Sequence, residues 1–163
     1  MKKILFTFAT LLSTTIFAET FENIEFQLPE AAQKWTSSRS ESTGENGTAK
    51  VLMYMKASPL EMFMVVASPE IQSTPETLDV EEAKAQIQAL IPGLNPELEI
   101  LETDGSSTLF KMRVKDEQGA LSMASFIRAV YGEKGTAVLL YQTASETALD
   151  PMWLDVLKGA TVH

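Results

Sequence analysis

The fold is decided by residues 98–143, LEILETDGSSTLFKMRVKDEQGALSMASFIRAVYGEKGTAVLLYQT. Three turn signals divide this stretch: Asp104-Gly105, residues 116–119, and residues 132–135, which begin and end in glycine. Between the turns lie four runs rich in apolar residues, 98–102, 108–115, 120–131 and 136–143. Short apolar runs joined by tight turns are typical of strands that pair in order along the chain. The stretch therefore predicts an antiparallel meander of four strands.

Upstream of the meander, three further apolar runs predict strands. Residues 24–28 alternate apolar and polar side chains and stop at Pro29, which predicts a short edge or entry strand. Residues 51–55 and 62–67 are continuously apolar, as expected where helices cover both faces of a sheet. Residues 36–48 are rich in Ser, Thr, Gly and Glu and predict an exposed connection, with a turn at Asn46-Gly47.

Two segments carry helix signals. The first begins at Ser73-Thr-Pro-Glu76, which supplies a cap, a proline in the first turn and a capping-box glutamate, and its apolar residues recur at helical spacing until Pro92-Gly93. The second begins at Asp150-Pro151 and ends at Gly159. Its apolar stripe, which we expect to dock against the sheet, consists of Leu149, Trp153, Val156 and Leu157.

This order of elements predicts an α+β fold with a mainly antiparallel sheet. It resembles the PsbP-like superfamily, which includes bacterial envelope proteins of the DcrB type. The resemblance is carried by Phe26-Gln-Leu-Pro29 followed by Trp35, by residues 62–68 leading to Thr74-Pro-Glu-Thr-Leu78, and by residues 137–145 before the Trp153 helix. The chain departs from DcrB-type lipoproteins in lacking the lipobox cysteine, and residues 31–34 lengthen the gap before Trp35. The resemblance implies an α/β/α sandwich around a mainly antiparallel central sheet. It also implies a partner-binding protein and supplies no catalytic residue.

The N-terminus predicts a bacterial export signal. Lys2 and Lys3 precede a mostly apolar stretch, residues 4–17, and Ala18 is a small residue suited to signal peptidase. The stretch is shorter and more polar than the roughly 20 apolar residues that a membrane-spanning helix needs. Cleavage after residue 18 would leave 145 residues, 19–163, which suit a single domain in the periplasm or outside the cell, with no membrane anchor.

The charge balance argues against nucleic acid as a partner. The whole chain has a formal net charge of −9, which becomes −11 when the signal removes two lysines and no acid. Such a chain repels phosphate backbones unless its cations are clustered. The candidate cations Lys50, Lys56, Lys111, Arg113 and Lys115 are too few to make nucleic acid a leading partner.

Residue types also limit the chemistry. The chain has no cysteine, which excludes thiol catalysis and zinc–thiolate sites, and its one histidine is the terminal His163. A Ser-His pair is therefore not expected, and the nucleophile-elbow pattern is incomplete at Ser122 because no glycine follows it. A Ser-Lys pair stays open as an alternative.

Two groups of residues are candidates for a site. Four acids, Glu97, Glu99, Glu102 and Asp104, form either a solvated strand end, the preferred interpretation, or a carboxylate pair or weak Ca²⁺ site. Met53, Met55, Met62 and Met64 form two Met-x-Met pairs that project from one face of each strand. Core packing is the preferred interpretation of these methionines, and a Cu(I) site is the alternative.

We therefore predict a non-enzymatic binding or accessory protein of the cell envelope, whose partner is another envelope protein or a small ligand. No catalytic, cofactor-binding or metal-binding residue is assigned. The alternatives are a hydrolase that uses carboxylates or a Ser-Lys pair and a methionine-based copper-binding protein.

Overall fold

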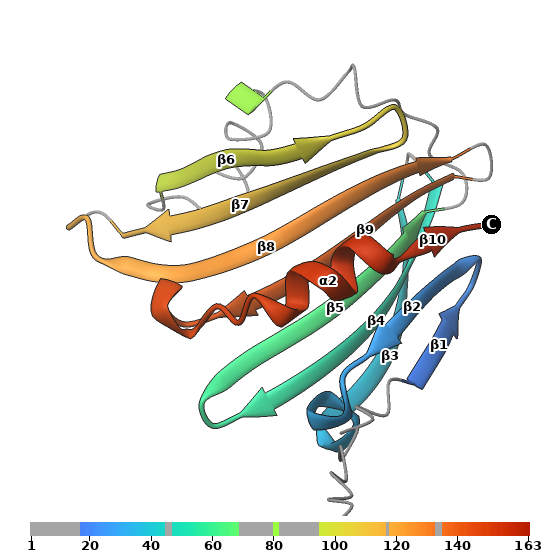
Figure 1. Cartoon of the computed structure of the whole chain (residues 1–163), viewed down its shortest axis with the longest axis horizontal. Coiled ribbons are helices and arrows are strands. Elements are labelled where there is room, and N and C mark those ends of the chain that lie inside the picture. The colour runs from blue at the N-terminus through green and yellow to red at the C-terminus, as the bar shows by residue number, and fades with distance from the viewer. Residues whose placement is uncertain (1–16, 45–46, 69–79, 82–94, 117, 133–134) are drawn as a thin grey trace, which may run out of the picture.

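The computed structural model describes residues 17–44, 47–68, 80–81, 95–116, 118–132 and 135–163. The predicted export signal up to residue 16 lies outside these ranges, and so does the predicted helix over residues 73–91, apart from Val80 and Glu81, which are helical. Within the described ranges the chain is mostly antiparallel β-sheet with one complete α-helix, α2 (Met152–Gly159) (Figure 1). None of the helices in these ranges is long and apolar enough to cross a bilayer.

A seven-stranded antiparallel sheet forms the body of the molecule, with strand order β3-β4-β5-β9-β8-β7-β6. The predicted meander is confirmed as the four strands β6 to β9, which pair in chain order. The long-range pairing of β5 with β9 joins this meander to β3, β4 and β5. The strand bounds are β3 (Thr36–Gly44), β4 (Gly47–Ala57), β5 (Leu60–Ser68), β6 (Asn95–Thr103), β7 (Ser107–Lys115), β8 (Leu121–Gly132) and β9 (Gly135–Thr143).

A second, three-stranded sheet and helix α2 lie on one face of the large sheet, which we call the core face (Figure 1). The small sheet has the order β1-β2-β10, with β1 (Phe17–Phe21), β2 (Ile24–Leu28) and β10 (Thr161–Val162). Two 3-10 helices, η1 (Glu30–Lys34) and η3 (Glu146–Ala148), complete the described elements. The strand predicted over residues 24–28 is confirmed as β2, but it is not an edge strand, because β1 and β10 pair with it from both sides. The predicted cleavage site after Ala18 lies inside β1.

The main core lies between the core face, the small sheet and α2, and Trp153 is at its centre. Trp153 is 2% exposed. Its ring stacks on Tyr141 with centroids 4.6 Å apart and lies 4.9 Å from Phe63 and 5.5 Å from Trp35. The prediction that this helix docks against the sheet through Trp153 is confirmed.

Both ends of α2 are fixed by polar side chains. Asp150 caps the N-terminus, because its Oδ1 accepts a hydrogen bond of 2.9 Å from the first backbone N–H of the helix. At the C-terminus, Arg128 of β8 donates from Nη1 to the carbonyls of Leu157, Lys158 and Ala160 at 2.7, 2.6 and 3.0 Å. A cation at this end also interacts favourably with the helix dipole.

The opposite face of the large sheet, the second face, carries a smaller apolar cluster. Its buried members are Met112, Val114 and Ile127. The continuous apolar run of residues 51–55 is shared between the faces: Leu52 and Tyr54 belong to the main core, whereas Met53 and Met55 point to the second face. The helix predicted to cover a sheet face, residues 73–91, lies outside the described residues apart from Val80 and Glu81.

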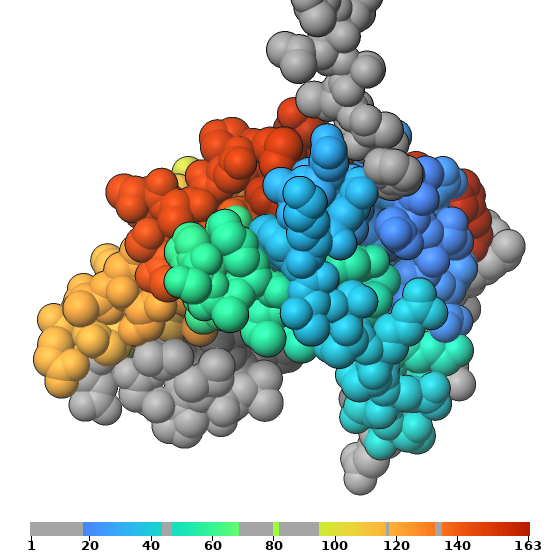
Figure 2. Space-filling view, turned by 90° about the horizontal axis from the view of Figure 1, so that it is seen from below, coloured from blue at the N-terminus to red at the C-terminus, as the bar shows by residue number. Residues whose placement is uncertain are grey.

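The prediction that residues 36–48 form a connection is wrong. Residues 36–44 form β3, which pairs with β4 over its whole length, and the hairpin closes at Gly44 and Gly47, where the sequence predicts a turn. The segment lacks a hydrophobic pattern because β3 is the outermost strand, and every residue from 36 to 43 is exposed. Figure 2 shows β3 and the start of β4 (light blue to teal) at the surface, where the end of the hairpin protrudes.

Candidate functional site

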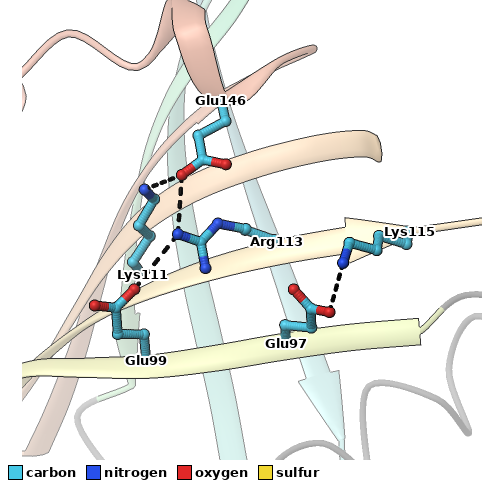
Figure 3. Close-up of polar contacts among 6 residues, drawn as sticks. All are labelled: Glu97, Glu99, Lys111, Arg113, Lys115 and Glu146. Carbon is cyan, nitrogen blue, oxygen red and sulfur yellow. Dashed lines mark hydrogen bonds and ion pairs between the residues drawn. The ribbon is translucent and has the colours of Figure 1, made fainter. Parts of the chain in front are cut away.

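Six charged side chains form an ion-pair network on the core face above β6 and β7 (Figure 3). Arg113 is at its centre: its Nη2 lies 2.9 Å from Oε1 of Glu146 and 3.5 Å from Oε2 of Glu99. Lys111 contacts the same Glu146 oxygen, and Lys115 contacts Glu97 at 2.6 Å. The three cations alternate along β7, so they point to one face, and η3 brings Glu146 over them.

The network favours the ionised form of two of its carboxylates, Glu146 and Glu97. Hydrogen bonds from Arg113 and Lys111 lower the pKa of Glu146 to about 2, and the hydrogen bond from Lys115 lowers the pKa of Glu97. The hydrogen bond to Glu146 in turn raises the pKa of Arg113. A general acid needs a raised carboxyl pKa to hold a proton at neutral pH, which is the opposite shift. The arrangement suits a structural role, in which the ion pairs of Glu146 hold η3 against the sheet.

The four acids of the predicted acidic cluster do not converge. Glu97 and Glu99 join the network, whereas Glu102 pairs with Lys158 of α2 at 2.6 Å. Asp104 accepts hydrogen bonds from the backbone N–H groups of residues 106 and 107 at 2.7 and 2.6 Å, which lower its pKa. Across the described ranges, no three His, Asp or Glu side chains are grouped so as to hold a metal ion. Glu102 and Asp104 lie at the end of β6, as the strand-end interpretation predicts, whereas Glu97 and Glu99 lie within the strand and are ion-paired.

The remaining sequence candidates are also paired or peripheral. Lys50 contacts Glu22 at 3.0 Å, which raises the pKa of the lysine, and Lys56 contacts Glu61 at 2.6 Å. All five cations considered for nucleic-acid binding therefore have carboxylate partners. Ser122 is exposed at the start of β8. The Nε2 of His163 lies 3.4 Å from Glu25 at the edge of the small sheet.

The open edge of β3 is the feature that the sequence analysis missed. In the described structure β3 pairs with β4 on one side only, so the backbone groups on its other side are available to a further strand. Along β3 the side chain of Arg39 points to the core face, because Arg39 pairs with Leu52 of the main core. Glu41 is two residues further along the strand and points to the same face. The Asn46-Gly47 turn was the available signal, because such turns join paired strands.

A hollow of about 330 Å³ lies beside this edge, between the tip of the β1–β2 hairpin and β3. Arg39 lies over the ring of Phe21, with its guanidinium carbon 5.7 Å from the ring centroid. The hairpin tip is constrained at Glu22, whose φ of 55° is in the left-handed region. The hollow is lined by Phe21, Glu22, Arg39, Ser40, Glu41 and Lys50, so it offers an apolar floor and charges of both signs.

The four methionines of the Met-x-Met pairs lie together on the second face. Met53 pairs directly with Met64 across β4 and β5, and Met55 pairs with Met62. Met55 is 39% exposed and the other three are half-buried. They belong to neither of the buried clusters found in the described residues.

No family model and no curated protein sequence matches the chain.

Proposed function

We propose that this chain is a non-enzymatic binding protein of the bacterial cell envelope, and that it binds a protein partner by adding a strand of that partner to β3. The observation that carries the proposal is the exposed, unprotected edge of β3. Strand addition uses backbone hydrogen bonds for affinity and neighbouring pockets for specificity. The edge of β3 supplies the backbone groups for these hydrogen bonds, and the hollow beside Phe21 and Arg39 supplies a neighbouring pocket.

The two edges of the large sheet differ in a way that supports this proposal. Proteins usually protect an edge with proline, clustered charge or a bulge. β6, at the far edge, has all three: Pro96, the acids at residues 97, 99 and 102, and a bulge between Ile100 and Glu102. β3 has no proline and no break in register over nine residues, and its charged residues are Arg39 and Glu41. An edge strand without these protections is expected where the protein uses the edge to pair with a strand of another chain.

The charges of β3 define the partner strand. An antiparallel partner should place an acid opposite Arg39 and a base opposite Glu41, because opposite charges stabilise directly facing pairs. A second copy of β3 meets this requirement when two strands pair about Ser40. In that register Arg39 of each copy faces Glu41 of the other.

Blocking the edge tests the proposal. Consecutive residues of an edge strand direct their backbone N–H groups to opposite sides, so either Ser40→Pro or Glu41→Pro removes an outward group and spares the ladder to β4. We expect one of these variants to keep the thermal midpoint of the wild type and to lose a partner that the wild type captures stoichiometrically from envelope extract. The matched controls Ser40→Ala and Glu41→Ala keep their N–H groups and should retain the partner. Equal capture by the folded proline variant would refute strand addition.

Charge exchange tests the second copy as the partner. Arg39→Glu and Glu41→Arg each place like charges opposite one another in a homodimer, whereas a mixture of the two variants restores both attractive pairs. Sedimentation equilibrium should therefore show association of the wild type and of the mixture, with each variant alone monomeric. Absence of association in every sample would exclude the second copy and leave a foreign strand as the partner.

We also propose that the fold is the α/β/α sandwich of the PsbP-like superfamily. The order of described elements supports this, since β3 to β5, the meander and a C-terminal tryptophan helix follow one another as in the sequence resemblance. The predicted export signal is the support for a periplasmic or secreted location. N-terminal sequencing of the protein recovered after expression with its own signal tests both the cleavage and the compartment.

A further inference from the structure

The methionine quartet, Met53, Met55, Met62 and Met64, occupies four neighbouring positions of the second face. Directly opposed residues in an antiparallel pair have Cβ atoms about 4.5–5.5 Å apart, and residues two apart along a strand are separated by about 7 Å. The register places one opposed pair at Met53 and Met64 and the next at Met55 and Met62. Because methionine has three rotatable bonds beyond its backbone, the four sulfur atoms can meet over the centre of this rectangle.

The neighbours of the quartet on the described strands β3 and β9 are uncharged. On the second face, β3 places Thr36 opposite Met55 and Ser38 opposite Met53, and β9 places Gln142 opposite Met62 and Leu140 opposite Met64. None of these neighbours is a cation that would repel a bound metal ion. The net charge of −9 also favours the approach of cations. The exposed fraction of Met55, 39%, leaves a route from solvent to the quartet.

Thioether sulfur selects soft ions. Neutral, polarisable ligands of this kind suit Cu(I), whereas Ca²⁺ and Mg²⁺ require oxygen ligands and Zn²⁺ prefers thiolate or imidazole. The chain has no cysteine to compete for a soft ion, and its one histidine, His163, is on the small sheet beside Glu25. We propose that the methionine quartet is a binding site for a soft monovalent cation, Cu(I), with Ag(I) as its redox-stable equivalent.

Replacement of methionine by leucine separates sulfur chemistry from packing. The two side chains have similar volume, so the exchange costs little stability in an apolar setting. The test compares the wild type with Met53→Leu/Met55→Leu, with Met62→Leu/Met64→Leu and with all four exchanges together. Met152→Leu is the matched control, because Met152 is 43% exposed and lies on α2, away from the quartet.

Ag(I) in chloride-free buffer, titrated by calorimetry, should bind the wild type and Met152→Leu with one ion per chain. Each double variant should bind at least tenfold more weakly, and the quadruple variant should show no saturable site. Labelled methionine methyl resonances should shift on Ag(I) addition at the four quartet positions and not at Met112 or Met152, a readout that needs no variant to fold. Undiminished binding by the quadruple variant, or equal shifts at all methionines, would overturn the proposal.

Cu(I) presented under reducing conditions should reproduce the Ag(I) stoichiometry, and Zn²⁺ and Ca²⁺ at the same concentration should not displace it. Displacement by either divalent ion would show that oxygen or nitrogen ligands form the site, and would refute the thioether assignment. The proposal does not depend on β3, so its test is independent of the test of strand addition.

Discussion

Replacing Trp153 by alanine tests how the domain is held together. Trp153 is 2% exposed and is packed against the rings of Tyr141, Phe63 and Trp35. Removing a buried tryptophan typically costs about 3–5 kcal/mol, and each aromatic pair accounts for about 0.5–1.5 kcal/mol of such losses. Two of the three facing rings, Tyr141 and Phe63, are on strands of the large sheet, which cannot collapse into the space left behind. We therefore expect a loss in the upper half of that range.

That loss is a large share of the roughly 5–15 kcal/mol that stabilises a domain. At about 3–4 °C per kcal/mol for a chain of this length, the thermal midpoint should fall by roughly 12–20 °C. Circular dichroism measures the midpoint, and Trp153→Phe, which keeps a ring on Tyr141, should lose much less. Met152→Ala is the matched control on the same helix, because Met152 is exposed. A Trp153→Ala midpoint within about 2 °C of the wild type would refute the packing argument.

Two further predictions concern charged groups. Arg128→Met keeps the aliphatic stem but leaves the carbonyls at the end of α2 without their guanidinium donor. Urea unfolding should therefore show a free energy of unfolding lower by about 2–3 kcal/mol, and Arg128→Lys should be intermediate. An unchanged urea midpoint would contradict the role of Arg128. Glu146→Gln should lower the thermal midpoint at neutral pH, and the difference from the wild type should shrink as pH falls from about 4.5 through about 2. The reason is that the folded pKa of Glu146 is lowered to about 2, so its stabilisation is present above the unfolded pKa and is lost on protonation. A difference that stays constant from pH 7 to pH 2 would count against the ion pairs of Figure 3.

Local signals predicted the meander and α2 because each of these elements is defined by its own residues. Asp104, Asp116 and Gly119 form the turns between strands, and Asp150 caps the helix. The strand β3 was missed for a physical reason: an edge strand exposed on both faces carries no alternation of apolar and polar side chains. The middle position of β2 was missed because one partner, β10, comes from residues 161–162, and the other, β1, overlaps the residues predicted as the export signal.

The candidate sites show the same division. The sequence identified the methionine pairs, and the alternation of side chains along a strand placed each pair on one face. It could not decide which face, because residues 51–55 are apolar on both sides and only the register with β5 and the position of α2 separate them. The sequence could not show the ion pairs either, because their members are far apart in the chain. Glu146, for example, is 35 residues beyond its partner Lys111.

By itself, the sequence determined the strand-rich class, the turns of the meander, the helix that carries Trp153, and the exclusion of thiol chemistry, because these depend on residue type and short-range spacing. Only the tertiary structure decided the order of strands in the large sheet, the open edge at β3, and the meeting of four methionines on the second face. These features depend on pairings between segments far apart in the chain, such as β5 with β9. Such pairings are fixed by the burial of the whole core, which no local pattern of residues specifies.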